Sequence, residues 1–168
     1  MRVLILGSGG REHAMAWKLS QSSLLDKMFI APGNAGTDML GENVALDIMD
    51  FRALGDFCVA ESIDMIVVGP EAPLAEGLVD AFRADASLNN VAIVGPSKAG
   101  AQLESSKRFS KEFMERHRIP TAKYASFSKG EIRAAQAYLD TLKAPYVIKA
   151  SGLAAGKGVI ITEKLQEA

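Results

Sequence analysis

Two lysines and a run of glycines form the segment of this chain best suited to chemistry. Residues 147 to 161 place a glycine-rich loop between two apolar, β-type runs, with Lys149 in the first run and Lys157 in the loop. The loop glycines are Gly152, Gly156 and Gly158. Glycine backbones can approach a polyphosphate closely and point N–H groups at it, while lysine ammonium groups add positive charge. The pattern predicts a phosphate clamp.

The spacing of this loop excludes a P-loop. A Walker sequence has four residues between its glycines and a Ser or Thr after its lysine, whereas three residues intervene here and Gly158 follows Lys157. The loop joins two apolar runs, so we expect a hairpin that lies over a nucleotide as a lid, which favours the ATP-grasp class. A Gly/Ala-rich hairpin connection without a ligand is the alternative that this segment alone leaves open.

A second glycine cluster follows the first predicted strand, at residues 2 to 6. It reads Gly7-Ser8-Gly9-Gly10-Arg11-Glu12-His13 and leads into an amphipathic run. This pattern predicts a βα turn whose amides hold an anion at the N-terminus of a helix. The alternative is a solvated first helical turn, in which Glu12 complements the helix dipole and His13 caps or packs.

The same cluster disfavours NAD as the ligand. A dinucleotide fingerprint has a third glycine where Glu12 stands, and it has an acidic residue near the end of the second strand. The second predicted strand, at residues 27 to 30, instead continues into Ala31-Pro32-Gly33-Asn34-Ala35-Gly36-Thr37. A different phosphorylated ligand is therefore favoured.

Two further predicted strands end in Gly-Pro. Residues 65 to 68 are followed by Gly69-Pro70-Glu71, and residues 91 to 94 by Gly95-Pro96. Ligands of open parallel sheets bind beyond the carboxyl ends of the strands, so we expect the segments 7–13, 32–37 and 69–74 to converge on one site. Glu71 can accept hydrogen bonds from sugar hydroxyls there, or it can serve as a carboxylate at a helix N-terminus.

The elements that position these residues alternate along the first part of the chain. Strands are expected at residues 2–6, 27–31, 64–68 and 91–94, and helices near 11–20, 50–61, 74–84 and 97–103. This alternation predicts an α/β domain over residues 1–103, a doubly wound parallel sheet with right-handed crossovers.

The second part of the chain has a different pattern. Residues 104–118 predict a helix closed by Ile119-Pro120, so residues 104–120 form a connecting helix. Residues 121–168 predict a strand, a helix at 129–142, a strand, the glycine loop and a strand, followed by the beginning of a helix. This is the opening half of a small α+β lid subdomain.

Composition restricts the class of protein. Of the 168 residues 48% are apolar and 23% charged, the net charge is -1, and Cys58 is the single cysteine. These values are typical of a globular cytoplasmic chain and argue against nucleic acid as the main partner. No apolar run is long enough for a membrane helix, and no signal peptide is expected. Cys58 has apolar neighbours at helical spacing, which favours a buried structural thiol over a nucleophile.

Five motifs in order carry a resemblance to a known family. They are Gly-Ser-Gly-Gly-Arg-Glu-His at 7–13, Ala-Pro-Gly-Asn-Ala-Gly-Thr at 31–37, Val-Gly-Pro-Glu-Ala-Pro-Leu at 68–74, Ser-Lys at 106–107 and Gly-Leu-Ala-Ala-Gly-Lys-Gly-Val at 152–159. Together they resemble the phosphoribosylamine-glycine ligase family of the ATP-grasp superfamily over essentially the whole chain. Ser151 stands where that family usually has an aspartate, which puts the ordering of the lid loop in question.

The resemblance implies an activity and two ligand sites. The family joins glycine to 5-phosphoribosylamine with ATP in purine biosynthesis, and it forms glycinamide ribonucleotide through a glycyl phosphate. The residues implied to bind ATP are Lys107, Lys149, Gly152, Leu153, Ala154, Ala155, Gly156, Lys157 and Gly158. Those implied to bind phosphoribosylamine are Gly9, Gly10, Arg11, Glu12, His13, Asn34, Gly36, Thr37, Gly69, Pro70 and Glu71.

Other parts of the family pattern have no counterpart in the 168 residues. The acidic and asparagine ligands of Mg²⁺ or Mn²⁺ are expected beyond Ala168, and no covalent nucleophile or metal ligand is expected before it. We therefore expect the chain to be the N-terminal portion of an enzyme, inactive by itself. Two alternatives remain: another ATP-grasp carboxylate ligase, such as a biotin carboxylase relative, and a non-catalytic module that binds a nucleotide or a sugar phosphate.

Overall fold

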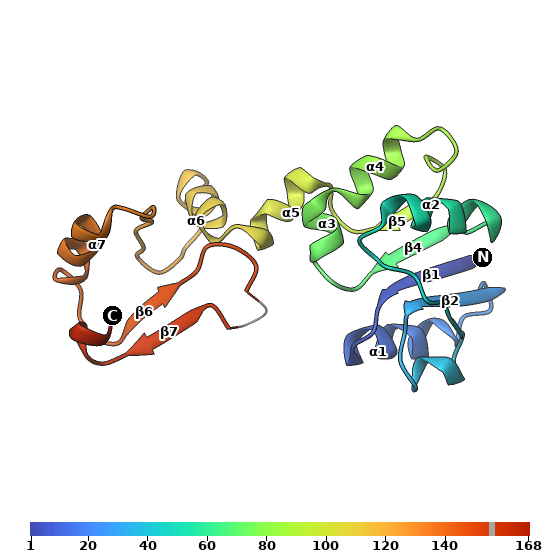
Figure 1. Ribbon diagram of the computed structural model, residues 1–168, viewed down its shortest axis with the longest axis horizontal. Coiled ribbons are helices and arrows are strands. Elements are labelled where there is room, and N and C mark those ends of the chain that lie inside the picture. Colours follow the sequence, from blue (N-terminus) through green and yellow to red (C-terminus); the bar gives the residue numbers. More distant parts are fainter. Residues whose placement is uncertain (155–156) are drawn as a thin grey trace. The chain divides into compact units, whose positions relative to one another are not determined.

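The computed structural model describes residues 1–154 and 157–168, which divide into two compact units. Unit 1 is Met1–Ala101 and unit 2 is Gln102–Ala168 (Figure 1). Nearly every buried apolar side chain of the described residues belongs to unit 1. Among the described residues, no helix has both the length and the apolar character to cross a membrane.

Unit 1 is built on a parallel sheet. Its strands are β1 (Arg2–Gly7), β2 (Lys27–Pro32), β3 (Glu42–Asn43), β4 (Met65–Val68) and β5 (Ala92–Val94). They lie in the order β3-β2-β1-β4-β5, and every neighbouring pair is parallel. The predicted doubly wound α/β sheet is thereby confirmed. The sequence did not reveal β3, because two residues at a sheet edge are too short to show a period.

Helices cover both faces of this sheet (Figure 1). They are α1 (Gly10–Leu19), α2 (Phe51–Ala60), α3 (Ala72–Glu76) and α4 (Leu78–Ala84), with a short 3-10 turn η1 at Thr37–Met39. Helix α5 (Lys98–Ser105) begins in unit 1, where its Ala101 packs with Leu74 and Val79, and ends in unit 2. On one face Ala16 of α1 packs against Val3 and Ile5 of β1. On the other face Leu54 of α2 and Phe82 of α4 pack in one cluster with Leu4 and Leu6. Alternate residues of β1 thus face opposite layers, as the pleat of a strand requires.

One predicted helix of unit 1 is wrong as a single element. Residues 74–84 were expected to form one helix, but the structure has α3 and α4, separated at Gly77. Gly77 has φ of 101° and ends α3 by donating its N–H to the carbonyls of Pro73 and Leu74. Glycine adopts this conformation without the steric penalty that a Cβ brings, so it divides the periodic pattern.

Unit 2 contains two helices and a hairpin. Its elements are α6 (Lys107–Arg116), α7 (Ile132–Leu139), β6 (Tyr146–Lys149), β7 (Val159–Thr162) and a 3-10 turn η2 (Leu165–Glu167). Strands β6 and β7 are antiparallel, with Tyr146 paired to Thr162 and Lys149 paired to Val159. The prediction that the glycine loop joins two strands of a hairpin is confirmed.

Three predictions for unit 2 need correction. The helix expected from residue 104 begins at Lys107, because Ser106 has extended backbone and caps α6 by accepting a hydrogen bond from the Phe109 N–H. The strand expected after residue 121 is absent, since residues 119–128 have no regular secondary structure. The last helix is represented by η2 alone. A strand needs a hydrogen-bonding partner, and local sequence cannot report whether one is present.

Candidate functional site

The strand ends of unit 1 bring its predicted site segments together. β1 pairs with β2 on one side and β4 on the other, with Gly7 opposite Pro32 and Leu6 opposite Val68. The loops that follow these three strands therefore start side by side at the carboxyl edge of the sheet. The chain order reverses at β1, and this switch point is where open α/β sheets bind their ligands.

Glu12 is buried beneath the first glycine loop. Its side chain is 6% exposed, its Oε2 accepts the Gly9 N–H at 2.7 Å, and its Oε1 accepts the Arg11 Nε–H at 2.9 Å. Burial raises the pKa of the Glu12 carboxyl, but the hydrogen bonds from Arg11 and Gly9, together with the Arg11 charge, outweigh it and hold that pKa below its ordinary value. The Glu12 side chain is therefore not solvated, whereas the Arg11 side chain is 61% exposed.

The loop after β2 is fixed by the side chain of Asn34. Asn34 Nδ2 donates to the Ser8 carbonyl at 2.9 Å, while Asn34 Oδ1 accepts the Gly36 N–H at 2.8 Å. These bonds link the second loop to the first across the strand ends. Asn34 therefore holds the shape of the site, which adds to the contact with substrate that the sequence predicted for it.

Thr37 and Asn43 complete the same network. Thr37 is fully buried, and its hydroxyl oxygen lies 2.9 Å from Asn34 O and 2.7 Å from Asn43 Oδ1, so its single proton has two acceptors within reach. Asn43 Nδ2 donates to the Asn34 carbonyl at 2.8 Å. Sequence analysis missed Asn43, because it lies in the two-residue strand β3 and no motif contains it. Only the pairing of β3 with β2 places Asn43 beside the second loop.

His13 and Gly36 lie against each other. A Cβ added at Gly36 would come 2.6 Å from His13 Nδ1, so only glycine leaves room for the imidazole ring there. The half-buried ring of His13 thus packs on the second loop. This contact fits the packing role that the sequence left open for His13.

The third loop holds the remaining predicted substrate residues. Gly69 follows β4 and donates its N–H to the Leu6 carbonyl at 3.0 Å, and Pro70 is half-buried. Glu71 is also half-buried and stands at the N-terminus of α3, although its side chain makes no capping hydrogen bond.

The remaining predicted substrate residue, Gly10, belongs to the first loop. Gly10 is the first residue of α1 and is exposed beside Arg11.

In unit 2 the base of the glycine loop is attached to the start of α6. The Ser151 carbonyl accepts the Lys107 N–H at 2.9 Å, and the Ser151 hydroxyl accepts the Arg108 N–H at 3.2 Å. Lys107 Nζ donates to the Gly152 carbonyl at 3.0 Å. Lys107 thus lies at the loop, as the resemblance implied, and Ser151 binds backbone amides that the helix itself leaves unpaired.

The rest of the loop presents lysines to solvent. Lys149, Leu153 and Lys157 are exposed, and the Lys157 N–H donates to the Ala154 carbonyl at 2.8 Å. A Cβ at Gly158 would come 2.6 Å from Ala154 Cβ, whereas Gly152 has no described atom within 4 Å of such a position. The predicted ATP-binding residues Ala155 and Gly156 lie outside the described residues.

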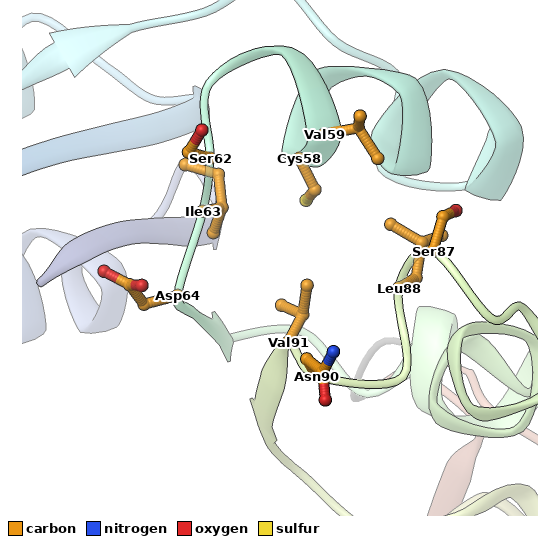
Figure 2. A pocket seen from close by; sticks show the side chains of 9 residues that line it. All are labelled: Cys58, Val59, Ser62, Ile63, Asp64, Ser87, Leu88, Asn90 and Val91. Carbon is orange, nitrogen blue, oxygen red and sulfur yellow. The ribbon is translucent and has the colours of Figure 1, made fainter.

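A cavity of about 400 Å³ lies at the opposite edge of the unit 1 sheet (Figure 2). Its lining includes Asp64 and Val91, which directly precede β4 and β5, so it is at the amino ends of the strands. Cys58 faces it from α2, is 2% exposed, and has its pKa raised to about 12 by burial. The prediction of a buried structural thiol is confirmed, since a thiolate does not form at neutral pH.

Side chains that could bind a metal ion are not grouped together among the described residues. The described residues contain no group of three or more His, Cys, Asp or Glu side chains placed to hold a metal ion. The exposed Lys149 and Lys157 and the amides of the hairpin loop offer positive charge, which suits a polyphosphate. A metal ion bound with that polyphosphate requires oxygen ligands from elsewhere.

Family models match the whole chain in two consecutive parts. Residues 1–104 match the N domain of phosphoribosylglycinamide synthetase, and residues 105–168 match the ATP-grasp (A) domain of the same family. Among curated proteins, the phosphoribosylamine–glycine ligase of Escherichia coli K12 is 54% identical over 170 residues, and that of Salmonella typhimurium LT2 is 55% identical. Each match covers all of this chain and 38% of the relative.

Solved structures give the same result. The phosphoribosylamine–glycine ligase of Thermotoga maritima aligns with a TM-score of 0.72 at 34% identity, over 99% of this chain and 37% of that one. The biotin carboxylase domain of 2-oxoglutarate carboxylase from Hydrogenobacter thermophilus, solved with MgADP and bicarbonate, aligns with a TM-score of 0.73 over 99% of this chain and 38% of that one. At 18% identity this second match shows the fold alone.

Proposed function

This chain belongs to the phosphoribosylglycinamide synthetase family, and from that membership we propose that the protein containing it joins glycine to 5-phosphoribosylamine at the expense of ATP. The products are glycinamide ribonucleotide, ADP and phosphate. The chain spans 38% of the length of the curated relatives it matches, so the activity belongs to a protein with the remaining length as well.

The chemistry explains why two anion sites are needed. A carboxylate resists attack by an amine because its leaving group is an oxide ion, so ATP first converts glycine to an acyl phosphate. The protein's part is to offset the charge spread over the transferring phosphoryl group with lysines and backbone amides. The amine nucleophile arrives on a second phosphate ester, phosphoribosylamine, which requires its own anion site.

One observation carries the proposal: each unit has one group of residues suited to an anion. In unit 1 the glycine loop after β1, the amides at the start of α1 and Arg11 suit the phosphate of phosphoribosylamine. Asn34 and Glu71 are within the adjoining loops and can bind sugar hydroxyls. In unit 2 the hairpin loop with Lys149 and Lys157, joined by Lys107, suits the phosphates of ATP.

Magnesium completes the ATP site in this proposal. When bound with ATP, it would offset the negative charge that develops on the transferring phosphoryl group. We place its acidic ligands in the length of the relatives that this chain does not cover. The 168-residue chain by itself is therefore expected to form no glycinamide ribonucleotide from ATP, glycine and phosphoribosylamine.

The proposed cellular setting follows from the substrates. All three are small metabolites, so we propose a cytoplasmic enzyme without a nucleic acid or membrane partner. Oligomeric assembly plays no part in the proposal.

Substitutions in the two groups of residues test the proposal in the full-length enzyme. Lys149→Ala should raise the ATP requirement and slow phosphoryl transfer, at a cost of about 2–4 kcal/mol, because a preorganised charge is lost. The affinity for phosphoribosylamine should stay close to its wild-type value. Arg11→Ala should do the reverse by removing a charge-assisted contact with the sugar phosphate.

Steady-state titrations of each substrate distinguish the possible outcomes. Arg11→Ala acting on ATP alone would show that the N-terminal glycine loop is the nucleotide site. A full-length protein that binds ATP and ribose 5-phosphate without turnover would favour the non-catalytic module. Ligation of a different carboxylate in place of glycine would favour another ATP-grasp ligase.

A further inference from the structure

The Glu12 carboxylate is a buried charge at the point where three segments of unit 1 meet. It sits in α1, one turn after the glycine loop, and its side chain is 6% exposed. A buried carboxylate is costly unless donors surround it, and an apolar side chain of similar volume would stabilise the fold equally well. Its presence at the carboxyl edge therefore calls for a specific reason.

The backbone of two strand ends is shaped around this carboxylate. A Cβ at Gly7, the last residue of β1, would come 2.6 Å from Glu12 Cγ, and a Cβ at Gly69 would collide with Glu12 Oε1. Gly69 has no positive φ that would require glycine, so the requirement there is purely steric. The Glu12 side chain thus fills the space between the loops after β1 and β4, and any side chain at position 69 would displace it.

Both partners of the carboxylate are donors. Oε2 takes the Gly9 N–H, and Oε1 takes the Arg11 Nε–H. Arg11 is bound through Nε alone, so its two terminal nitrogens keep four N–H groups for a ligand. The guanidinium is exposed, and the anchor at Nε restricts its orientation before any ligand arrives.

We propose that Glu12 is a positioning residue that holds the Gly9 amide and the Arg11 guanidinium in the arrangement that binds a phosphate monoester. Glu12 acts through these two groups and does not itself touch the ligand, since a carboxylate facing a phosphate would repel it. The inference rests on the proposed function, in which this edge of unit 1 binds a sugar phosphate.

The substitution Glu12→Gln removes the negative charge and one hydrogen-bond acceptor at position 12 and keeps the size of the side chain. Glutamine has the same size but offers one acceptor and one NH₂ group, and the NH₂ group then faces either Gly9 N–H or Arg11 Nε–H, both donors. One of the two anchors must be lost. Glu76→Gln is the matched control, because Glu76 is exposed on α3 of the same unit.

The test measures ribose 5-phosphate binding to the 168-residue chain by calorimetry, with ribose as the control that lacks the phosphate. Glu12→Gln should weaken binding about tenfold, the size expected for one charge-assisted hydrogen bond. In the double variant with Arg11→Ala, Glu12→Gln should cost less affinity than it does in the wild-type chain, because only its effect through the Gly9 amide is left. Fully additive losses would overturn the proposal, since they would show that Glu12 does not act through Arg11.

A second variant keeps the test valid if Glu12→Gln does not fold. Arg11→Lys keeps the positive charge at an exposed position but removes the anchored fork, so it should lose nearly as much affinity as Arg11→Ala. Wild-type affinity in Arg11→Lys would show that charge alone suffices and would overturn the proposal.

Amide and guanidinium signals in NMR spectra separate this inference from the proposed function. In Glu12→Gln the Gly9 N–H or the Arg11 Nε–H signal should shift and exchange faster with water, whereas Glu76→Gln should leave both unchanged. Unchanged signals in Glu12→Gln would refute the inference whether or not a ligand binds. Absence of ribose 5-phosphate binding to the wild-type chain, with the signals shifting as expected, would instead refute the sugar-phosphate site.

Discussion

At the residue scale, side-chain oxygens hold the glycine loops in both units. In unit 1 the Glu12 carboxylate accepts the Gly9 N–H, and in unit 2 the Ser151 hydroxyl accepts the Arg108 N–H. Glycine supplies a backbone that can approach a phosphate, but it also loses the most conformational entropy on ordering. A fixed oxygen at the base of each loop offsets part of that loss.

At Ser151, the position where the resemblance implies an aspartate, the hydroxyl accepts the Arg108 N–H at the start of α6. Ser151→Ala should remove the acceptor for Arg108 N–H and destabilise the first turn of α6 by about 1 kcal/mol, as the loss of a helix cap does. The first turn of α6 should be at least as stable in Ser151→Asp as in the wild-type chain, because a carboxylate also interacts favourably with the helix N-terminus. Hydrogen exchange at the Arg108 amide measures both effects.

Ser110→Ala is the matched control for these variants, since Ser110 lies further along α6 and away from the loop. It should leave exchange at Arg108 unchanged. Equal exchange at Arg108 in the wild-type chain and in Ser151→Ala would mean that the hydroxyl contributes nothing to the attachment of the loop.

At the element scale, the ends of helices and strands decide which groups are presented. α3 ends at Gly77, and α4 starts from it, so a single left-handed residue redirects the chain. In unit 2 the Ser106 cap starts α6 at Lys107, which places Lys107 at the glycine loop. Periodicity locates such elements, whereas capping residues set their limits.

Gly77→Ala should therefore lower the free energy of unfolding of unit 1 by about 1–2 kcal/mol, the cost of a Cβ in left-handed conformation. Gly10→Ala is the matched control, because Gly10 has no positive φ and no described atom lies within 4 Å of an added Cβ. Its effect should stay within about 0.5 kcal/mol. Denaturant unfolding followed by the fluorescence of Trp17, the single tryptophan, reports on unit 1. Equal stability of the two variants would contradict the assignment of strain to Gly77.

At the scale of the whole molecule, the two units differ in how much apolar surface they bury. The buried core side chains extend from Val3 to Ala101, whereas α6 and α7 have no buried residues. In the hairpin, Val147, Ile160 and Ile161 are exposed by 50%, 56% and 67%. A sheet of two strands with exposed apolar side chains is marginal in water.

Amide hydrogen exchange of the 168-residue chain should therefore be slowest in β1, β2 and β4 and faster throughout unit 2. The Val147–Lys149 amides of β6 should exchange at least about tenfold faster than the Leu4–Leu6 amides of β1. Equal protection of both strands would show that unit 2 is stabilised by contacts that its described residues do not provide, for instance with a second copy of the chain. A dilution series distinguishes that case, since self-association depends on concentration.

Local sequence patterns were enough to predict the parallel sheet, the hairpin and the segments that form the candidate sites. Buried strands followed by glycine are strong local signals, and in a parallel sheet the ends of such strands must meet at one edge. The five motifs, taken in order, also identified the family.

Folding was needed to establish which of these residues are exposed and which hold the loops in place. Glu12 lies at a helix start for which the sequence left a solvated turn open as the alternative, yet Gly7 and Gly69, far apart in the chain, enclose it. Asn43 joins the network through a strand too short to detect, and Ser151 meets α6 across more than forty residues. Such contacts join backbone segments that approach each other only after folding. The residue pattern within each segment therefore does not predict them.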